Sequence, residues 1–270
     1  MNFLFTYVVM YTGGIETLIL RMSDWLIKKG YNVDLLLIKD EGELLYKINK
    51  NVNVYSLGAS PEWRFLKMYK NNSFKNNYDV IYSFSPITTW MSLLIAKKCI
   101  NKPVVLNGVY HIYDYKLFAN SYHRKIFDKK LPDECKVFMT PQVMVEHEQI
   151  LGRRIVDPVI WPLPITEFEN TDRQPQKFKI VSIGRLDNFK TYNILMLDVI
   201  KELVMANYDI TYYIYGDGIM FNNIKEKISL LGLEKCVFLC GTIEYEKISL
   251  VLSDAYVFIG MGTSVIEAGL

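Results

Sequence analysis

Short runs of apolar residues alternate along the chain with longer stretches that carry helix-start signals. The runs are almost continuously apolar, which is typical of parallel strands covered on both faces. Three helices are predicted to be capped by Ser60, Ser85 and Thr140, because each hydroxyl residue precedes a proline. Strand, helix and strand repeated in this way predict a doubly wound α/β domain. In the first half of the chain the predicted strands are Phe3–Val9, Val33–Ile38, Val52–Leu57, Val80–Phe84, Val104–Val109 and Lys136–Met139.

The repeat breaks near residues 158–179, where four prolines lie among polar residues, and we interpret this stretch as an interdomain linker. The sequence therefore predicts two Rossmann-like α/β domains, residues 1–164 and 165–270. We expect the second domain to be incomplete, because it has fewer predicted strands than the usual five or so and the chain stops at Leu270 in a helix that begins near Ser264. Its predicted strands are Lys179–Ile183, Thr211–Tyr215, Val237–Leu239 and Tyr256–Ile259.

Composition narrows the class of protein. Half of the residues are hydrophobic and 22% are charged, which fits a globular protein with a sizeable core. The 31 basic and 29 acidic residues give a net charge of +2, so we expect no nucleic-acid partner. The apolar runs are shorter than the roughly 20 residues of a membrane-spanning helix. The first ten residues lack the basic region of a signal peptide, and we expect a cytoplasmic protein.

The cysteines and histidines do not form a metal-binding pattern. None of the four cysteines stands in a C-x-x-C pair, and we expect Cys236 and Cys240 to be buried free thiols, as in a reducing cytosol. The three histidines are widely spaced, and no Asp-x-Asp pair follows a predicted strand. We therefore expect neither a metal ion nor a separate cofactor.

Four segments directly follow predicted strands, at the edge of a parallel sheet where ligands bind against helix N-termini. In the first segment, Gly13 and Gly14 open a helix; they either bring the backbone close to a substrate or form only a tight turn. In the second, Arg185 and Lys190 flank a loop that leads into a helix. A lysine there opposes the helix dipole unless an anion such as phosphate lies between the cations and the free amides. The alternative is two solvated cations.

The third and fourth segments are glycine turns. Gly216 and Asp217 follow a strand, and Asp217 either caps the next helix or contacts a base or ribose. The last turn can form a nest of backbone amides for a phosphate, although Val265 replaces the third glycine of a dinucleotide fingerprint. Glu267 either closes a capping box with Ser264 or reaches a ribose. The candidate residues of the last turn are Gly260, Gly262, Thr263, Ser264 and Glu267.

These four segments, in this order within two α/β domains, resemble the retaining glycosyltransferases of family 4, also called glycosyl transferases group 1, which have the GT-B fold. The resemblance extends over essentially the whole chain and includes the segment Val237–Gly241. It implies that the first domain binds the acceptor and the second a UDP- or GDP-sugar. It also implies that Arg185 and Lys190 neutralise the donor diphosphate. Glu267, matching the second glutamate of the family's E-x7-E motif, would hold the ribose.

Two departures from the family pattern concern the donor site and the end of the chain. The first glutamate of E-x7-E would stand at position 259, where this chain has Ile259, and the amides of residues 260–262 remain to contact the sugar. The family's segments after this helix are absent from the sequence. His111 follows a predicted strand where the family often has a histidine facing the reaction centre. It is the candidate catalytic residue, polarising the sugar or orienting the acceptor, and a structural role is the alternative.

No carboxylate stands out as a nucleophile, which favours attack by the acceptor hydroxyl on the face from which the diphosphate departs, with Arg185 and Lys190 in place of a metal ion. Residues 63–70 and 113–130 mix aromatic with basic side chains. Such faces can rest on an anionic membrane surface, or belong to half-buried helices with solvated lysines. A membrane contact would suit a lipid-linked saccharide acceptor in cell-surface polysaccharide synthesis. Two other functions remain open: a nucleotide-sugar epimerase of similar architecture, and a truncated, inactive nucleotide-binding chain.

Overall fold

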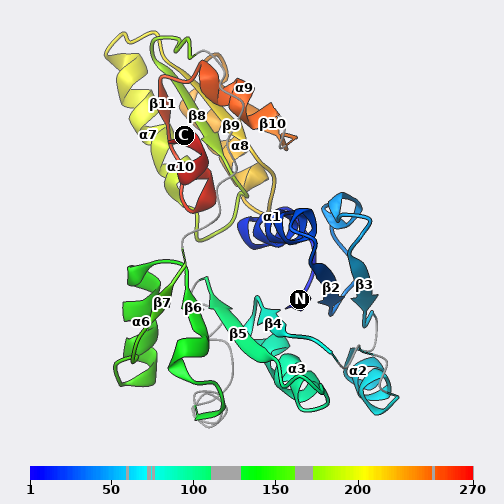
Figure 1. The fold of residues 1–270 in the computed structure, drawn as a ribbon. Helices are drawn as coiled ribbons and strands as arrows, with labels where there is room; N and C mark the ends of the chain where they lie inside the picture. The colour runs from blue at the N-terminus through cyan, green and yellow to red at the C-terminus, as the bar shows by residue number, and fades with distance from the viewer. Residues whose placement is uncertain are drawn as a thin grey trace. The chain divides into compact units, whose positions relative to one another are not determined.

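The computed structural model describes residues 1–58, 61–71, 74, 77–110, 129–161, 173–244 and 247–269. The chain forms two compact units, Met1–Pro164 and Ile165–Leu270 (Figure 1). Each unit has its own parallel sheet, and helices cover the sheets as expected for α/β units. The predicted fold class, two Rossmann-like α/β domains, is confirmed.

The first unit is built on a seven-stranded sheet in the order β3-β2-β1-β4-β5-β6-β7. The chain runs outward from β1 to β3, returns to β4 beside β1, and then runs outward in the other direction, as in doubly wound sheets. Its elements are β1 (Asn2–Tyr7), α1 (Gly14–Lys28), β2 (Asn32–Leu37), η1 (Leu45–Lys47), β3 (Asn53–Ser56), α2 (Pro61–Lys70), β4 (Val80–Ser83), α3 (Pro86–Ala96), β5 (Val104–Val109), η2 (Asp133–Cys135), β6 (Lys136–Phe138), α6 (Pro141–Leu151) and β7 (Val159–Ile160).

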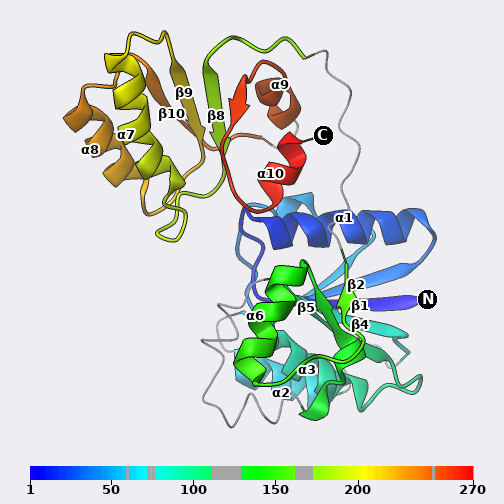
Figure 2. The same cartoon turned by 90° about the vertical axis from the view of Figure 1, so that its left-hand side faces the viewer.

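Successive residues of the central strands point to opposite faces of this sheet and fill two cores. Leu4 and Ile81 pack in the core that α2, α3 and α6 cover. Phe5 and Tyr82, their neighbours along the chain, pack in the core that α1 covers. Figure 2 shows α1 on one side of the sheet and α2 and α3 on the other. Because both faces are buried, the central strands are mostly apolar, which is why their sequence pattern is nearly continuous.

The second unit has a four-stranded parallel sheet in the order β10-β9-β8-β11. Helices α7 and α8 cover one core, which includes Leu197 and Ile224. A smaller core on the other face includes Ile183 and Ile248. The elements are β8 (Lys179–Ile183), α7 (Tyr192–Met205), β9 (Thr211–Tyr215), α8 (Phe221–Leu231), β10 (Val237–Gly241), α9 (Ile248–Ser253), β11 (Val257–Phe258) and α10 (Thr263–Ala268).

Two of the predicted helix caps are confirmed. The Ser85 hydroxyl accepts a hydrogen bond from the Thr88 N–H at 3.3 Å, and the Thr140 hydroxyl accepts one from the Val143 N–H at 3.2 Å. Both helices have proline in their first turn. The third predicted cap, Ser60, lies outside the described residues.

The predicted linker is wrong at its start, because Val159–Ile160 forms strand β7. This strand pairs with β6, and the Trp161 N–H extends the pairing by donating to the Phe138 carbonyl at 2.9 Å. A two-residue strand between prolines has no periodicity of its own. Its conformation is fixed by a neighbouring strand, which the local sequence does not show.

The expectation that Cys236 and Cys240 are buried thiols is wrong. All four cysteines are free, but Cys236 is half-buried and Cys240 is exposed. Strand β10 lies at the edge of its sheet, and its residues alternate between buried or half-buried and exposed positions. The alternation places Phe238 and Cys240 on the outer side. Within the described ranges, no helix is long and apolar enough to span a bilayer.

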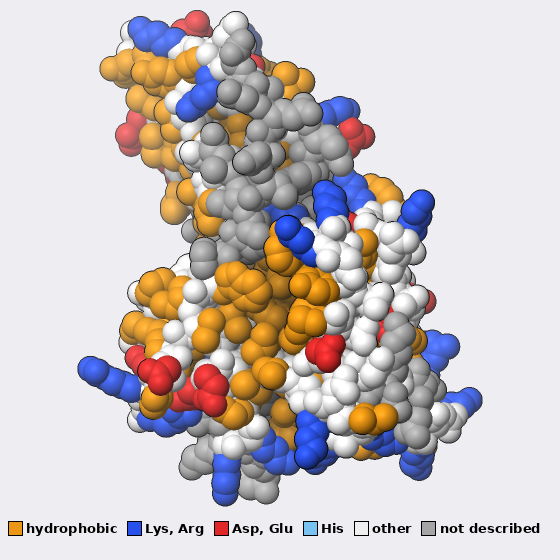
Figure 3. Space-filling view, in the orientation of Figure 1, with side chains coloured by type: hydrophobic (Ala, Val, Ile, Leu, Met, Phe, Trp, Pro, Cys, Tyr) orange, Lys and Arg blue, Asp and Glu red, His pale blue; other side chains and the backbone are white. Residues whose placement is uncertain are grey.

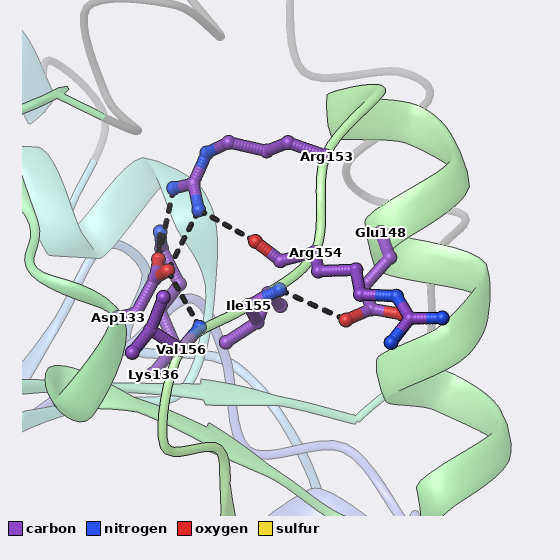
Figure 4. Close-up of polar contacts among 7 residues, drawn as sticks. All are labelled: Asp133, Lys136, Glu148, Arg153, Arg154, Ile155 and Val156. Carbon is purple, nitrogen blue, oxygen red and sulfur yellow. Dashed lines mark hydrogen bonds and ion pairs between the residues drawn. The ribbon is translucent and has the colours of Figure 1, made fainter.

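An ion-pair network connects η2 and the start of β6 to the segment between α6 and β7 (Figure 4). The Lys136 ammonium, whose side chain is 0% exposed, lies 2.7 Å from the Asp133 carboxylate. Arg153 donates to both oxygens of that carboxylate, at 2.7 and 2.9 Å, and the Val156 N–H donates to it at 3.1 Å. Arg153, with Lys136 also contributing, holds the pKa of Asp133 well below its usual range. Asp133 therefore accepts the hydrogen bonds that connect these segments of the first unit.

Candidate functional site

Two loops of the second unit lie together at the carboxyl edge of its sheet. The Gly184 N–H donates to the Tyr215 carbonyl at 2.9 Å, and the Leu186 N–H donates to the Asp217 carbonyl at 2.9 Å. The Met220 N–H closes the set by donating to the Leu186 carbonyl at 3.0 Å. The loop after β8 and the loop after β9 therefore form a single backbone platform, at the edge where parallel sheets bind ligands.

Glycine is required where the two loops cross. At Gly216, where φ is +148°, a Cβ atom would lie 2.0 Å from the Gly184 carbonyl oxygen. At Gly218, where φ is +149°, it would lie 2.5 Å from the Leu186 carbonyl oxygen. A side chain at either position would force the loops apart and strain the backbone. This packing accounts for Gly216 by itself, so its contact with a nucleotide stays a prediction.

Asp217 has a local role in the same turn. Its carboxylate accepts a hydrogen bond from the Gly218 N–H at 2.7 Å, which is an interaction typical of aspartate in turns. The residue is exposed. Its predicted contact with a base or ribose is not needed to explain the turn and stays a prediction.

The two cations of the loop after β8 differ in their surroundings. Arg185 is half exposed and forms an ion pair with Asp187, with 3.1 Å between Nε and Oδ2. Lys190 is more enclosed, and within the described part of the chain it forms no ion pair. Burial and the charge of Arg185 lower the pKa of Lys190, and Asp187 raises it in part. Arg185, Asp187 and Lys190 together give this loop a formal charge of +1.

Tyr192, the first residue of α7, brings a hydroxyl to the same place. A Cβ atom on Gly184 would lie 3.3 Å from the Tyr192 hydroxyl and 3.5 Å from the Lys190 ammonium. The hydroxyl is buried. Burial raises the pKa of Tyr192, and a hydrogen bond with the Asn193 side chain lowers it in part. An enclosed cation and a buried hydroxyl thus lie beside the same glycine, and sequence reasoning missed Tyr192.

A buried hydrogen-bonded group fixes the start of α7 to the sheet. The Asn193 side-chain oxygen accepts hydrogen bonds from the Tyr212 hydroxyl at 2.7 Å and from the Ser182 hydroxyl at 2.9 Å. All three residues are buried. Because Ser182 lies in β8 and Tyr212 in β9, the helix start that carries Tyr192 is held by both strands.

The last glycine turn differs from the predicted capping box. Helix α10 begins at Thr263, and its N-cap is Gly262, with φ of +76°. The Ser264 hydroxyl donates to the Met261 carbonyl at 3.3 Å inside the turn. Ser264 is thus already within the helix, so its predicted role as N-cap paired with Glu267 is wrong. Glu267 lies half-buried in the last turn of α10, and its contact with a ribose stays a prediction.

Ile259 and Gly260, at the start of this segment, have structural contacts in the second unit. The Ile259 N–H donates to the Val181 carbonyl at 2.9 Å, and the Ile259 side chain packs on the core that α7 and α8 cover. At Gly260, a Cβ atom would lie 2.7 Å from the Phe258 ring. The position that would carry the first glutamate of the E-x7-E motif is therefore occupied by a side chain that packs in the protein.

In the first unit, Gly13 is the N-cap of α1 and Gly14 is its first residue. Buried Glu16 reaches back over this turn, because a Cβ atom on Gly13 would lie 2.4 Å from its Oε2 atom. The Tyr7 hydroxyl donates to the other carboxylate oxygen of Glu16 at 3.4 Å. A side chain at position 13 would displace the Glu16 carboxylate, and substrate contacts of Gly13 and Gly14 stay predictions. His111 lies outside the described residues.

Aromatic residues line the carboxyl edge of the first sheet, a feature that sequence reasoning missed. Tyr7 ends β1, and Phe84, Tyr110 and Trp161 directly follow β4, β5 and β7. Phe84 contacts Tyr7 and is stacked with Tyr110, and Trp161 contacts Tyr82. In Figure 3, apolar side chains gather on the part of the first unit that faces the viewer. The signal was available, because each aromatic residue stands at or just after the end of an apolar run.

Among the described residues, no group of three or more histidine, cysteine or acidic side chains is placed to hold a metal ion. The charged side chains of the platform discussed above are Arg185, Asp187, Lys190 and Asp217. Lys190 also lies over the ring of Phe189, with 5.9 Å between its ammonium and the ring centroid.

Comparison with known proteins defines the class. The glycosyltransferase family 4 model matches residues 12–150, and the glycosyl transferases group 1 model matches residues 165–269. The chain belongs to this family of glycosyltransferases, and its fold is that of GT-B enzymes. The resemblance drawn from the sequence motifs is confirmed, and so is the assignment as a transferase.

Individual relatives are distant. A 2-deoxystreptamine N-acetyl-D-glucosaminyltransferase of Niallia circulans is 22% identical over 306 residues, covering 96% of this chain and 78% of the relative. The structure of HepE from Anabaena, solved with UDP and glucose, has a TM-score of 0.73 at 14% identity and covers 96% of this chain and 73% of HepE. The lipopolysaccharide glycosyltransferase WaaG has a TM-score of 0.70 at 12% identity, with 98% and 78% covered. At these identities the solved structures establish the fold.

Proposed function

We propose that the chain transfers a sugar, with retention, from a UDP- or GDP-sugar to a saccharide or lipid-linked saccharide in cell-surface polysaccharide synthesis. The observation that carries this proposal is the enclosed Lys190 ammonium, which lies with Arg185 on the glycine platform of the second unit and has no ion-pair partner in the described residues. A nucleoside diphosphate is the anion that such a platform suits. The complexes of HepE with UDP and with UDP and glucose support a nucleotide-sugar donor.

The candidate residues form two groups, one that binds the donor and one that serves the acceptor. In this proposal Arg185 and Lys190 bind the diphosphate and stabilise the charge that develops as it departs, which is the largest electrostatic demand of the reaction. Glu267 holds the ribose, and the amides of residues 260–262 face the donor. Gly13, Gly14 and His111 serve the acceptor side, with His111 orienting the acceptor or polarising the sugar. The acceptor hydroxyl attacks on the face from which the diphosphate leaves, without a metal ion or a further cofactor.

The first test is calorimetric binding of UDP and GDP to the 270-residue chain. We expect one nucleotide to bind and to identify the base, followed by transfer of radiolabelled sugar from the matching donor to a lipid extract. A folded sample that binds neither nucleotide would overturn the donor assignment. Turnover of the donor with no acceptor present would instead indicate an epimerase, a function that the comparisons do not favour.

A membrane-surface contact is part of this proposal and is supported by one face of α2. Trp63 and Leu66 are 78% and 45% exposed, and Lys67 and Lys70 are exposed as well. These four residues follow the spacing of one helical face, which combines apolar side chains with cations in the way interfacial helices do. In this proposal the protein is cytoplasmic and rests against the inner face of the membrane. Of the second candidate stretch, 113–130, only residues 129 and 130 are described.

Vesicle flotation at low salt tests this contact. We expect the chain to float with vesicles that contain phosphatidylglycerol and not with phosphatidylcholine alone. Changing Lys67 or Lys70 to Gln should each weaken binding roughly fivefold, because a lysine near an anionic surface contributes about 1 kcal/mol. Trp25→Ser is the matched control, since Trp25 is 57% exposed on α1. Equal binding to both kinds of vesicle, or none, would contradict the proposal.

A further inference from the structure

Trp161 is a large aromatic residue that stays exposed at the carboxyl edge of the first sheet. It directly follows β7 and is 48% exposed. Its main chain is fixed, because the Trp161 N–H donates to the Phe138 carbonyl at 2.9 Å and so continues the pairing of β7 with β6. Ligands of parallel sheets bind outside this edge. The indole therefore lies where a substrate of the first unit would bind.

Buried rings support the indole from one side. The Trp161 ring packs edge-to-face against Tyr82, with 6.1 Å between the ring centroids and 68° between the ring planes. Tyr82 is 4% exposed, and its hydroxyl accepts a hydrogen bond from the Tyr110 hydroxyl at 3.1 Å. Phe84 packs against both tyrosine rings, with centroid distances of 4.6 and 5.9 Å. The indole thus rests on a packed aromatic cluster and keeps a large surface accessible to a ligand.

The chemistry of these rings favours an uncharged ligand with both apolar and polar groups. Burial raises the pKa of Tyr82 to about 12, so the phenol beneath the indole is neutral. An aromatic ring has a negative face, which attracts the weakly positive C–H groups on one face of a pyranose ring. The indole also has an N–H donor at its edge, which suits a sugar hydroxyl. A saccharide ring combines these two features.

A hydrocarbon chain matches the indole less well. It has no acceptor for the indole N–H, and it gains from burial against any apolar side chain, whether flat or branched. A saccharide ring, in contrast, requires a flat aromatic face for stacking. This difference allows the two ligands to be separated by substitution at position 161.

We propose that the Trp161 indole stacks against a sugar ring of the acceptor, so that the carboxyl edge of the first sheet recognises the saccharide part of that substrate. Trp161 is then an acceptor-binding residue, and the aromatic cluster beneath it fixes its position. This inference rests on the proposed function, since it requires a saccharide acceptor in the first unit.

The test measures transfer of radiolabelled sugar to a lipid extract, at saturating donor, by the wild-type, Trp161→Phe and Trp161→Leu chains. Each keeps an apolar side chain against Tyr82, but the leucine variant has no aromatic face. We expect Trp161→Leu to raise the half-saturating concentration of extract roughly tenfold, and Trp161→Phe to raise it less. Binding of UDP or GDP should not change. Trp25→Leu is the matched control, because Trp25 is 57% exposed on α1 of the same unit.

The water-soluble saccharide that mild acid releases from the extract separates sugar recognition from lipid recognition. Added as a competitor at a sub-saturating concentration of extract, it should inhibit transfer by the wild-type chain. Roughly tenfold more should be needed to inhibit Trp161→Leu to the same degree. No inhibition of the wild-type chain, or equal inhibition of both chains, would assign the indole to the lipid part and overturn the inference.

The remaining outcomes distinguish this inference from the proposed function. If the wild-type chain transfers sugar and Trp161→Leu needs no more extract, or if Trp161→Phe is as weak as Trp161→Leu, the inference fails and the proposed function stands. Weakened nucleotide binding by Trp161→Leu would indicate a structural role and would also overturn the inference. If the wild-type chain transfers no sugar, the proposed function itself fails.

Discussion

Asp133→Ala is expected to lower the free energy of unfolding of the first unit by about 3–5 kcal/mol, the cost of removing one partner of a buried ion pair. Lys136 is 0% exposed and lies 2.7 Å from the Asp133 carboxylate. Without that carboxylate, the buried ammonium loses this counter-charge, Arg153 loses its two hydrogen bonds to Asp133, and the Val156 N–H loses this acceptor. Urea unfolding followed by tryptophan fluorescence measures the effect selectively. All four tryptophans, Trp25, Trp63, Trp90 and Trp161, lie in the first unit.

The control for this variant is Asp198→Ala, which breaks an exposed pair. Asp198 lies 2.6 Å from the Lys227 ammonium, and its side chain is 55% exposed. Exposed pairs contribute about 1 kcal/mol or less, and Asp198 lies in the second unit, so the tryptophan signal should be unaffected. An Asp133→Ala variant that unfolds at the wild-type urea concentration would contradict the role assigned to this network.

The same network makes the stability of the first unit depend on pH in the acid range. The pKa of Asp133 is lower in the folded than in the unfolded chain, chiefly because of Arg153. Its stabilising contribution is therefore fully present above the unfolded pKa of about 3.9 and is lost as pH falls toward the folded pKa. Wild-type stability should thus fall more steeply below about pH 4 than that of Asp133→Asn.

Removing the cations of the platform has the second large expected effect. Arg185→Ala and Lys190→Ala should each weaken binding of the diphosphate roughly tenfold to hundredfold, as expected for charge-assisted hydrogen bonds. The effect of Lys190→Ala should be the larger, because Arg185 is half exposed and already paired with Asp187, whereas Lys190 is enclosed. Calorimetry with UDP and GDP measures both variants, and Lys201→Ala, on the same unit in α7, is the control.

The pH dependence of binding identifies Lys190 independently. Its pKa is lowered by burial and by Arg185, so the ammonium that binds phosphate is lost at a lower pH than for an ordinary lysine. Affinity should fall as pH rises through that pKa, and this alkaline loss should be absent in Lys190→Ala. Unchanged affinity in both alanine variants would place the diphosphate elsewhere.

Much of the fold could be predicted because the strands that build it are buried on both faces. Val104–Val109 and Lys179–Ile183 have the predicted bounds, since a continuous apolar run is visible without knowing its neighbours. Strand β7 could not be predicted, because pairing with β6 alone fixes Val159–Ile160. The exposure of Cys240 also depends on which strand lies at the sheet edge, and sequence order does not give that.

The sequence placed the candidate residues relative to the predicted strands but did not give their contacts. The position of Arg185 and Lys190 after an apolar run placed them at the right edge of the sheet. Their environments differ because Arg185 pairs with Asp187 whereas Lys190 is more buried. A sequence pattern does not show either contact or burial at this level. Ser264 is the opposite case. Its spacing from Glu267 matches a capping box, but in the structure Gly262 is the N-cap of α10. Tyr192 looked like an ordinary helix residue until its hydroxyl was placed beside Gly184.

The Asp133 network also restricts the order in which these positions can change during evolution. Loss of Lys136 first leaves Asp133 with Arg153 and the Val156 N–H as partners, so a lineage can replace the lysine by an apolar residue at modest cost. Loss of Asp133 first removes the carboxylate that lies 2.7 Å from the buried Lys136 ammonium, and we expect this order to cost more stability. Once Lys136 has gone, replacement of Asp133 no longer removes a counter-charge from a buried ammonium. The cost of replacing Asp133 thus depends on whether Lys136 has already been replaced, so we expect Lys136 to change first.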